Sequence, residues 1–161
     1  MGEYIKDIES LKDLIEGERK KGRTIVFGNG CFDILHVGHI RYLKAAKALG
    51  DILIVAINDD ESVTKLGKRK KVVTPAAERA EILTAIDCVD YVITFSEPTV
   101  ERLLLELKPH IHAKGTDYTE DTVPEKDIVI SYGGKVAIVG DPKNHSTRDI
   151  IKTIQNLDKD S

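Results

Sequence analysis

Two histidines separated by a short spacing are the residues best suited to chemistry on a phosphate. His36 and His39 are three positions apart, so on a helical turn both side chains face the same way. Gly38 between them has no side chain that could block a ligand. Two imidazoles in such a place can donate hydrogen bonds to a phosphoryl group and stabilise the charge that grows on it during displacement. The alternative is that both are ordinary residues of a turn and a helix start.

The loop that contains these histidines follows a short apolar segment. Residues 24–27 predict a strand that ends at Gly28-Asn29-Gly30, and residues 37–49 predict a helix. Glycines at such a position let the backbone approach a phosphate, and a helix N-terminus favours an anion. The dinucleotide-binding fingerprint is incomplete here, because Asp33 occupies the position of its third glycine. A protein-bound metal is not expected, since no third ligand lies nearby at a familiar spacing.

Strand-like and helix-like segments alternate along the whole chain. Strands are predicted at residues 24–27, 52–57, 91–94, 111–113 and 135–139, and helices at 6–20, 37–49, 76–86, 99–107, 125–131 and 146–157. This order predicts a single Rossmann-like, three-layer α/β domain over residues 1–161, with a parallel sheet of about five strands and helices on both faces. Residues 1–22 are expected to be a helical extension and residues 23–157 the catalytic core. Ligands bind such sheets outside the carboxyl ends of the strands.

The composition of the chain argues against several classes of protein. A net charge of -3 over 161 residues argues against a nucleic-acid-binding protein, which usually has a basic excess. Two cysteines, Cys31 and Cys88, cannot form a disulfide framework, so a reducing compartment is expected. No apolar run approaches the length of a membrane span, and the charged N-terminus lacks a secretory segment. These features predict a cytoplasmic protein without a membrane partner.

The segment from Gly30 to His39, Gly-Cys-Phe-Asp-Ile-Leu-His-Val-Gly-His, resembles the HxGH signature of the cytidylyltransferase-like nucleotidyltransferases. It is most similar to the heptose 1-phosphate adenylyltransferases, including the adenylyltransferase half of the bifunctional heptose kinase/adenylyltransferase. The run Asn29-Gly30-Cys31-Phe32-Asp33 is typical of that branch, whereas glycerol-3-phosphate cytidylyltransferases tend to have threonine in place of Cys31. The resemblance extends over residues 24–154.

The resemblance implies a role for each matching position. The catalytic residues would be His36, His39 and Lys65. The nucleotide-binding residues would be Gly30, Cys31, Phe32, Gly38, His39, Lys114, Gly115, Asp117, Ser146 and Thr147. The acceptor-binding residues would be Asp33, Asn58, Arg79 and Tyr118. No metal ligand from the protein is implied, and Mg²⁺ would enter together with ATP.

Some of these positions also have a purely structural explanation. Asp33 could cap a turn, and Asn58 and Ser146 could each cap a helix. Arg79 could form a structural ion pair instead of reaching a phosphate. Residues 65–71 contain five lysines and arginines, which are either a solvated surface or a phosphate-binding flap. Both explanations stay open at each of these positions.

The reaction implied by the resemblance is in-line attack of an acceptor phosphate oxygen on the α-phosphorus of a nucleoside triphosphate. We expect transfer of AMP from ATP to a sugar 1-phosphate, D-glycero-D-manno-heptose 1-phosphate in particular, giving an ADP-sugar and pyrophosphate. Two alternatives remain: CTP-dependent transfer to glycerol-3-phosphate, and a non-catalytic nucleotide-binding protein on the same fold. The resemblance also suggests a homodimer.

Overall fold

A parallel β-sheet forms the centre of the molecule. The computed structural model describes residues 1–65, 72–142, 146–157 and 159, and within these residues six strands pair in the order β1-β4-β3-β2-β5-β6. All five pairings are parallel. The strands are Glu3–Tyr4 (β1), Ile25–Gly30 (β2), Ile52–Asn58 (β3), Tyr91–Phe95 (β4), Ile111–Lys114 (β5) and Lys135–Ile138 (β6). The predicted α/β class is confirmed, with six strands where about five were expected.

The strand order reverses beside β2. The chain runs outward from β2 through β3 to β4, and then crosses back to place β5 on the other side of β2. In register, Ile25 pairs with Ile52 of β3, while Val26 pairs with Ile111 of β5. Such a reversal leaves a crevice at the carboxyl ends of the two central strands, where the connecting loops part. The loop with the two histidines leaves β2 at this point.

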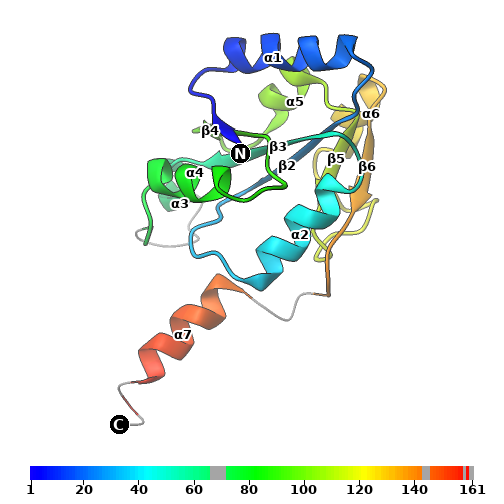
Figure 1. The fold of residues 1–161 in the computed structure, drawn as a ribbon. Helices are drawn as coiled ribbons and strands as arrows, with labels where there is room; N and C mark the ends of the chain where they lie inside the picture. Colours follow the sequence, from blue (N-terminus) through cyan, green and yellow to red (C-terminus); the bar gives the residue numbers. More distant parts are fainter. Residues whose placement is uncertain (66–71, 143–145, 158, 160–161) are drawn as a thin grey trace.

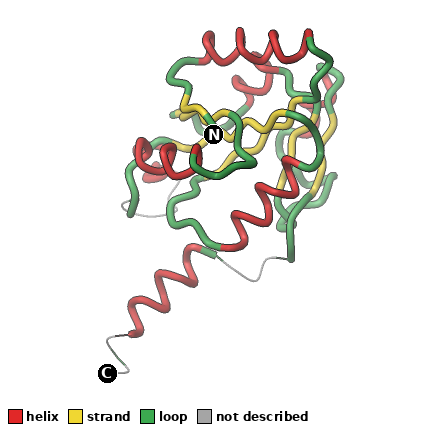
Figure 2. The backbone as a smooth tube through the Cα atoms, viewed as in Figure 1, coloured by secondary structure: helices red, strands yellow, loops and turns green. Residues whose placement is uncertain are grey.

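Helices cover both faces of the sheet (Figures 1 and 2). The helices of the described residues are Ile8–Lys20 (α1), Val37–Lys47 (α2), Asp60–Lys65 (α3), Ala76–Thr84 (α4), Glu101–Leu107 (α5), Lys126–Ser131 (α6) and Thr147–Leu157 (α7), of which α7 does not cover the sheet. The core on one face joins Phe27 to residues of α1, α5 and α6. On the other face, Val26 packs with residues of α2 and α4. Neighbouring residues of β2 therefore point into opposite cores.

The N-terminal segment is part of the packed core. Asp7 caps α1 by accepting a hydrogen bond from the Ser10 backbone N–H at 2.8 Å, and Leu11 and Ile15 of this helix are almost fully buried. Each such side chain contributes roughly 1.5–3 kcal/mol through burial. Strand β1 pairs with β4 and extends the sheet. Residues 1–22, expected to be an extension, thus form one strand and one covering helix of the domain.

Helix α7 differs from the other helices in its surroundings. It extends away from the rest of the chain in Figure 1. None of its residues, all of which the structure describes, is buried. Its start is tied to the loop after β2, because the Thr147 hydroxyl donates to the Ile34 carbonyl at 3.1 Å. Its bounds agree with the predicted helix at residues 146–157 to within one residue. Among the described residues, no helix is long and apolar enough to cross a membrane.

Candidate functional site

A cavity of about 670 Å³ opens where β2 and β5 end. It is lined by every residue predicted for the site except Lys65 and Arg79. These residues come from the loops after β2, β3 and β5 and from the start of α7: Gly30, Cys31, Phe32, Asp33, His36, Gly38, His39, Asn58, Lys114, Gly115, Asp117, Tyr118, Ser146 and Thr147. The topology therefore gathers positions more than a hundred residues apart in the sequence at one end of the sheet.

The two histidines are held as a stacked pair at the N-terminus of α2. Their ring centroids lie 3.9 Å apart, with an angle of 29° between the rings. Nδ1 of His36 accepts a hydrogen bond from the Gly38 backbone N–H at 3.1 Å, and Nδ1 of His39 accepts one from the backbone N–H of His36 at 3.2 Å. A nitrogen that accepts carries no hydrogen, so both rings are in the tautomer that has its hydrogen on Nε2. Each ring can therefore donate a hydrogen bond from its Nε2–H group.

Phe32 packs between His39 and Tyr42. The ring centroid of Phe32 lies 5.1 Å from that of His39 and 6.4 Å from that of Tyr42. Phe32 has a φ of 50°, a left-handed conformation that a bulky residue adopts only where the surroundings impose it. A Cβ atom at Gly30 would lie 3.0 Å from the Phe32 ring, so Gly30 makes room for this side chain. Gly30, which was expected to let the backbone approach a phosphate, makes room for the Phe32 ring in this structure.

Tyr42 links α2 to β5 across the switch point. Its hydroxyl donates to the Ala113 carbonyl at 2.6 Å, and burial raises the pKa of this phenol. A Cβ atom at Gly28 would lie 2.4 Å from the Tyr42 hydroxyl oxygen, so glycine is required for the tyrosine to cross β2. This bond attaches the middle of α2 to β5, and His39 lies three positions before Tyr42 on the same helix.

Arg79 lies in the wall of the site and does not line the cavity. Its guanidinium is fully buried and donates to the carbonyls of Cys31, Asn58 and Thr74 at 2.7–2.8 Å. It also pairs with Asp60 at 2.8 Å. These bonds are the partners that the structural explanation of Arg79 requires, and its expected contact with an acceptor stays a prediction. One side chain thereby joins the loops after β2 and β3 to the start of α4.

Asp33 binds the backbone of another loop in the same wall of the site. Its two carboxylate oxygens accept hydrogen bonds from the backbone N–H groups of Val73 and Thr74, at 2.9 and 2.7 Å. It is 4% exposed and lines the cavity. Asn58 is also 4% exposed, and its amide donates to the Ser62 hydroxyl at 3.1 Å. Both side chains have structural partners, and their expected contacts with an acceptor stay predictions.

Lys65 does not reach the cavity. It forms a 2.8 Å ion pair with Glu61, one helical turn earlier, and its side chain is 71% exposed. This carboxylate raises the pKa of Lys65. The helix directs this side chain to the surface, and the catalytic role expected for Lys65 stays a prediction. The remainder of the predicted basic flap, residues 66–71, lies outside the described residues.

Lys114 is the cation that the structure brings to the cavity from β5. It is 8% exposed, and its Nζ lies 4.6 Å from the centre of the Tyr118 ring, an arrangement that favours a cation. Burial, followed by the charges of Asp117 and Glu125, raises the pKa of Tyr118, which keeps this phenol neutral. Lys114 therefore adds positive charge at the end of the sheet where the histidine donors lie.

The start of α7 closes the other side of the cavity. The Ser146 hydroxyl accepts from the Asp149 backbone N–H at 3.1 Å, which is the geometry of a helix N-cap. The loop after β6 is held nearby, because the Thr116 hydroxyl donates to the Asp141 carbonyl at 2.7 Å and Arg41 pairs with the Asp141 carboxylate at 2.8 Å. A helix N-terminus and its cap form a favourable place for phosphate.

Sequence reasoning missed several residues that line the cavity. These are Asn29, Tyr42, Thr116, Val139, Gly140, Asp141, Pro142 and Arg148. Tyr42 had a detectable signal, since it is three positions after His39 on the same helix. The loop after β6 had one too, because it follows a predicted strand. Among the described residues, no group of three or more His, Cys, Asp or Glu side chains could hold a metal ion.

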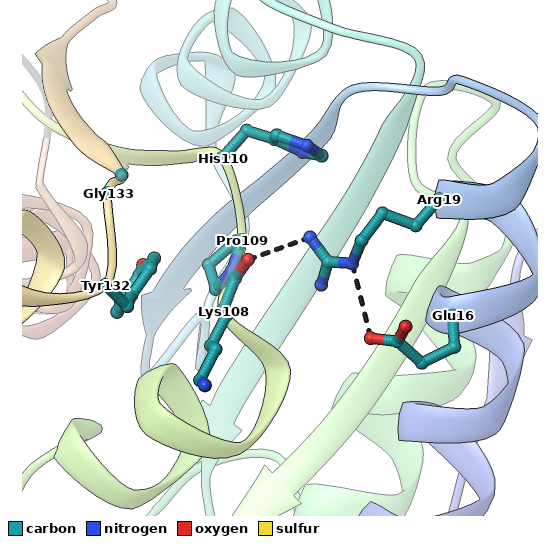
Figure 3. Close-up of a pocket in the computed structure, with 8 residues that line it drawn as sticks. Glu16, Arg19, Lys108, Pro109, His110, Tyr132 and Gly133 are labelled. Carbon is teal, nitrogen blue, oxygen red and sulfur yellow. Dashed lines mark hydrogen bonds and ion pairs between the residues drawn. The ribbon is translucent and has the colours of Figure 1, made fainter.

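A second cavity, of about 350 Å³, lies at the amino-terminal edge of the sheet (Figure 3). Its main cation, Arg19 of α1, donates to the Lys108 carbonyl at 3.0 Å and to the Leu107 carbonyl, and pairs with Glu16 at 3.3 Å. Burial raises the pKa of the neighbouring Tyr132 to about 12, so this phenol is neutral. Arg19 thus attaches α1 to the end of α5, and this cavity is a structural joint.

The chain is similar to known proteins over most of its length. Residues 27–156 match the family model described as Cytidylyltransferase-like. Relatives named Bifunctional protein HldE are 49% identical over 150 residues in Geobacter metallireducens and 46% identical over 149 residues in Pseudomonas fluorescens. These matches cover 93% and 92% of this chain but 31% of each relative, so the chain spans about a third of their length.

Solved structures show the same fold. The crystal structure of the lipopolysaccharide core biosynthesis protein from Thermoplasma volcanium has a TM-score of 0.62 and 31% identity, covering 73% of this chain and 95% of that one. The pantoate-β-alanine ligase from Francisella tularensis, solved with β-γ ATP and β-alanine, has a TM-score of 0.60 and 18% identity. That match covers 96% of this chain and 77% of the ligase and shows a common fold alone.

Proposed function

The chain belongs to the cytidylyltransferase-like family of nucleotidyltransferases, and from this premise we propose that it transfers AMP from ATP to a sugar 1-phosphate, D-glycero-D-manno-heptose 1-phosphate in particular. The observation that carries the proposal is the pair of Nε2–H donors, His36 and His39, held by backbone amides at the mouth of a cavity at the switch point. Such preorganised donors suit a reaction in which charge develops on a phosphoryl group.

The reaction needs positioning more than covalent help from the protein. An oxygen of the acceptor phosphate forms a bond to the α-phosphorus of ATP while the bond from that phosphorus to the bridging oxygen of the β-phosphate breaks. The electron pair leaves with pyrophosphate. His36 and His39 would donate to the non-bridging oxygens of the α-phosphate, whose charge grows in the transition state. Mg²⁺ enters bound to the triphosphate as part of the substrate.

The remaining phosphates would lie between β5 and α7. Lys114 supplies positive charge from the sheet. The N-terminus of α7, with the cap at Ser146 and the hydroxyl of Thr147, supplies backbone donors and the positive end of the helix dipole. These elements support binding of a triphosphate, because they supply positive charge and hydrogen-bond donors to its oxygens.

The choice of acceptor is supported by the relatives. The chain is nearly half identical to proteins named Bifunctional protein HldE, and a relative of 31% identity is named a lipopolysaccharide core biosynthesis protein. The loop after β2 resembles the heptose 1-phosphate adenylyltransferases, with Cys31 where the glycerol-3-phosphate enzymes tend to have threonine. These similarities support a sugar 1-phosphate over a phosphorylated alcohol.

A panel of substrates tests the proposal. Pyrophosphate release is measured with ATP, CTP, GTP and UTP, each against D-glycero-D-manno-heptose 1-phosphate and glycerol-3-phosphate. We expect turnover with ATP and the heptose phosphate. Turnover with CTP and glycerol-3-phosphate alone would overturn the substrate assignment and retain the chemistry. Tight nucleotide binding without release on any pair would support a non-catalytic binding protein.

A homodimer, suggested by the resemblance, is part of this proposal. One chain has a mass of 17.9 kDa, so light scattering on a sizing column distinguishes one copy from two. We expect twice the mass of the chain. The mass of a single chain at the concentrations used for assays would contradict it.

A further inference from the structure

His112 on β5 is a buried titratable residue that the mechanism above does not use. Its side chain is 0% exposed and packs edge-on against Phe27, with ring centroids 5.5 Å apart. Nε2 of His112 lies 3.1 Å from Oδ1 of Asn29, which lines the cavity near the end of β2. The histidine is thus one hydrogen bond away from the proposed nucleotide site.

The surroundings of His112 fix the position of its hydrogen. Burial, assisted by the nearby charge of Lys114, lowers the pKa of His112 to about 3, so the ring is neutral and has a single N–H. Nδ1 has no hydrogen-bond partner among the described residues. A buried N–H without an acceptor is rarer in proteins than a buried acceptor without a donor, so the hydrogen belongs on Nε2. Nε2–H therefore donates to Oδ1 of Asn29.

This hydrogen bond determines which way the amide of Asn29 faces. With Oδ1 held by His112, the NH₂ group of Asn29 is turned away from the histidine. Phe27 pairs with His112 in the sheet, and two residues further along both strands are Asn29 and Lys114. Continuing this register places Asn29 next to Lys114 at the ends of β2 and β5, and both residues line the cavity.

We propose that His112 is a positioning residue, which holds the amide of Asn29 so that its NH₂ group donates to a phosphate oxygen of the bound nucleotide. Without the donor on His112, the amide can rotate by half a turn and present its oxygen, which a phosphate repels. The inference rests on the proposed function for the identity of the nucleotide, which is ATP.

Affinity for a non-hydrolysable ATP analogue, measured by titration calorimetry with Mg²⁺, tests this role. His112→Phe keeps an aromatic ring against Phe27 and removes the donor, and we expect it to weaken binding about tenfold. His112→Gln has an amide that can donate to Asn29 and should bind within about threefold of the wild type. Asn29→Ala should also weaken binding about tenfold, and adding His112→Phe to it should cost nothing further, because the histidine acts through Asn29.

His110→Phe is the matched control. His110 accepts a hydrogen bond from the Ile25 backbone N–H at 2.9 Å, at the opposite end of the same strands. Its loss should lower thermal stability and leave the affinity for the analogue unchanged. Additive losses in the double variant, or wild-type affinity in His112→Phe, would overturn the inference. The proposed function is judged separately, by turnover: the expected affinities in a chain that turns over no acceptor would contradict the function and support the role of His112.

Discussion

At the scale of single residues, hydrogen bonds from backbone amides set the tautomer of the two histidines. Because Nδ1 of each ring accepts from an N–H group at the start of α2, His36 and His39 are both restricted to donating from Nε2. Protonation of either ring would place a hydrogen on Nδ1 and break the bond that orients it. The role proposed for the pair is therefore donation from Nε2, and not proton abstraction by Nδ1.

Removal of His39 tests this role. We predict that His39→Ala lowers kcat for pyrophosphate release by about a hundred- to thousand-fold, the loss expected for one preorganised donor to a developing charge. The variant also removes the acceptor for the His36 backbone N–H, which should lower stability by about 1 kcal/mol. Thermal unfolding monitored by circular dichroism shows whether the fold is retained. Unchanged turnover in the folded variant would remove His39 from the mechanism.

A buried histidine also predicts a pH dependence of stability. Unfolded His112 has the ordinary pKa of 6.5, whereas in the folded chain burial lowers it to about 3. Between these values the unfolded chain binds a proton that the folded chain does not, so stability is complete above pH 6.5 and is lost as the pH falls. The loss amounts to about 1.4 kcal/mol per pH unit.

The variant His112→Gln isolates this contribution, because glutamine does not titrate. Urea unfolding at about pH 7.5 and about pH 5 should show the wild type losing roughly 2 kcal/mol more than the variant between the two conditions. His110, whose pKa burial also lowers, is present in both chains and affects them equally. Identical losses in the two proteins would mean that His112 is not held neutral by the fold.

These residues differ in how far the sequence could predict them. His36 and His39 stand in a motif, and the structure brings both to the cavity. Arg79 was expected at a phosphate, but the carbonyls that it binds come from segments up to 48 residues away in the chain, and no local pattern reveals them. His112 was missed because a single histidine in a four-residue strand has no distinguishing neighbours.

At the scale of elements, one buried guanidinium holds together the loops that form the wall of the site. We predict that Arg79→Ala lowers the free energy of unfolding by about 3 kcal/mol or more, because three carbonyls lose their donor in a buried place. The control is Arg102→Ala. Its ion pair with Glu97 is largely exposed, so its loss should cost under about 1 kcal/mol. Equal losses in urea unfolding would show that Arg79 does not brace the loops.

Two substitutions in α1 test whether this N-terminal helix is part of the packed core. Leu11 of α1 is 0% exposed in the core, whereas Leu14 of the same helix is 38% exposed. We predict that Leu11→Ala costs about 2–5 kcal/mol of unfolding free energy, and that Leu14→Ala costs much less. A negligible cost for both variants would mean that α1 is a detachable extension of the domain.

Most elements could be predicted because burial leaves a periodic or wholly apolar pattern. All seven residues of β3 are buried, and the sequence there is almost entirely apolar. Strand β1 was missed because two residues are too short to show alternation. The position of α7 could not be predicted, since its amphipathic pattern indicates a helix without indicating what that helix packs against.

At the scale of the whole molecule, the strand order explains why one cavity collects the predicted residues. Strand β2 lies between β3 and β5, so the loops after all three open at the same edge of the sheet. The start of α7 reaches this edge through the bond from Thr147 to Ile34. In the reaction proposed for this cavity, the bond of ATP that breaks would be the one between its α- and β-phosphates.

The fate of the α-phosphate tests that statement most directly. The protein is incubated with D-glycero-D-manno-heptose 1-phosphate and Mg²⁺, together with ATP labelled at either the α- or the γ-phosphate. We predict that the α-label moves into an ADP-sugar and that the γ-label appears in pyrophosphate. An α-label that remains in ADP, with the γ-label in orthophosphate or in a sugar bisphosphate, would contradict nucleotidyl transfer at this site.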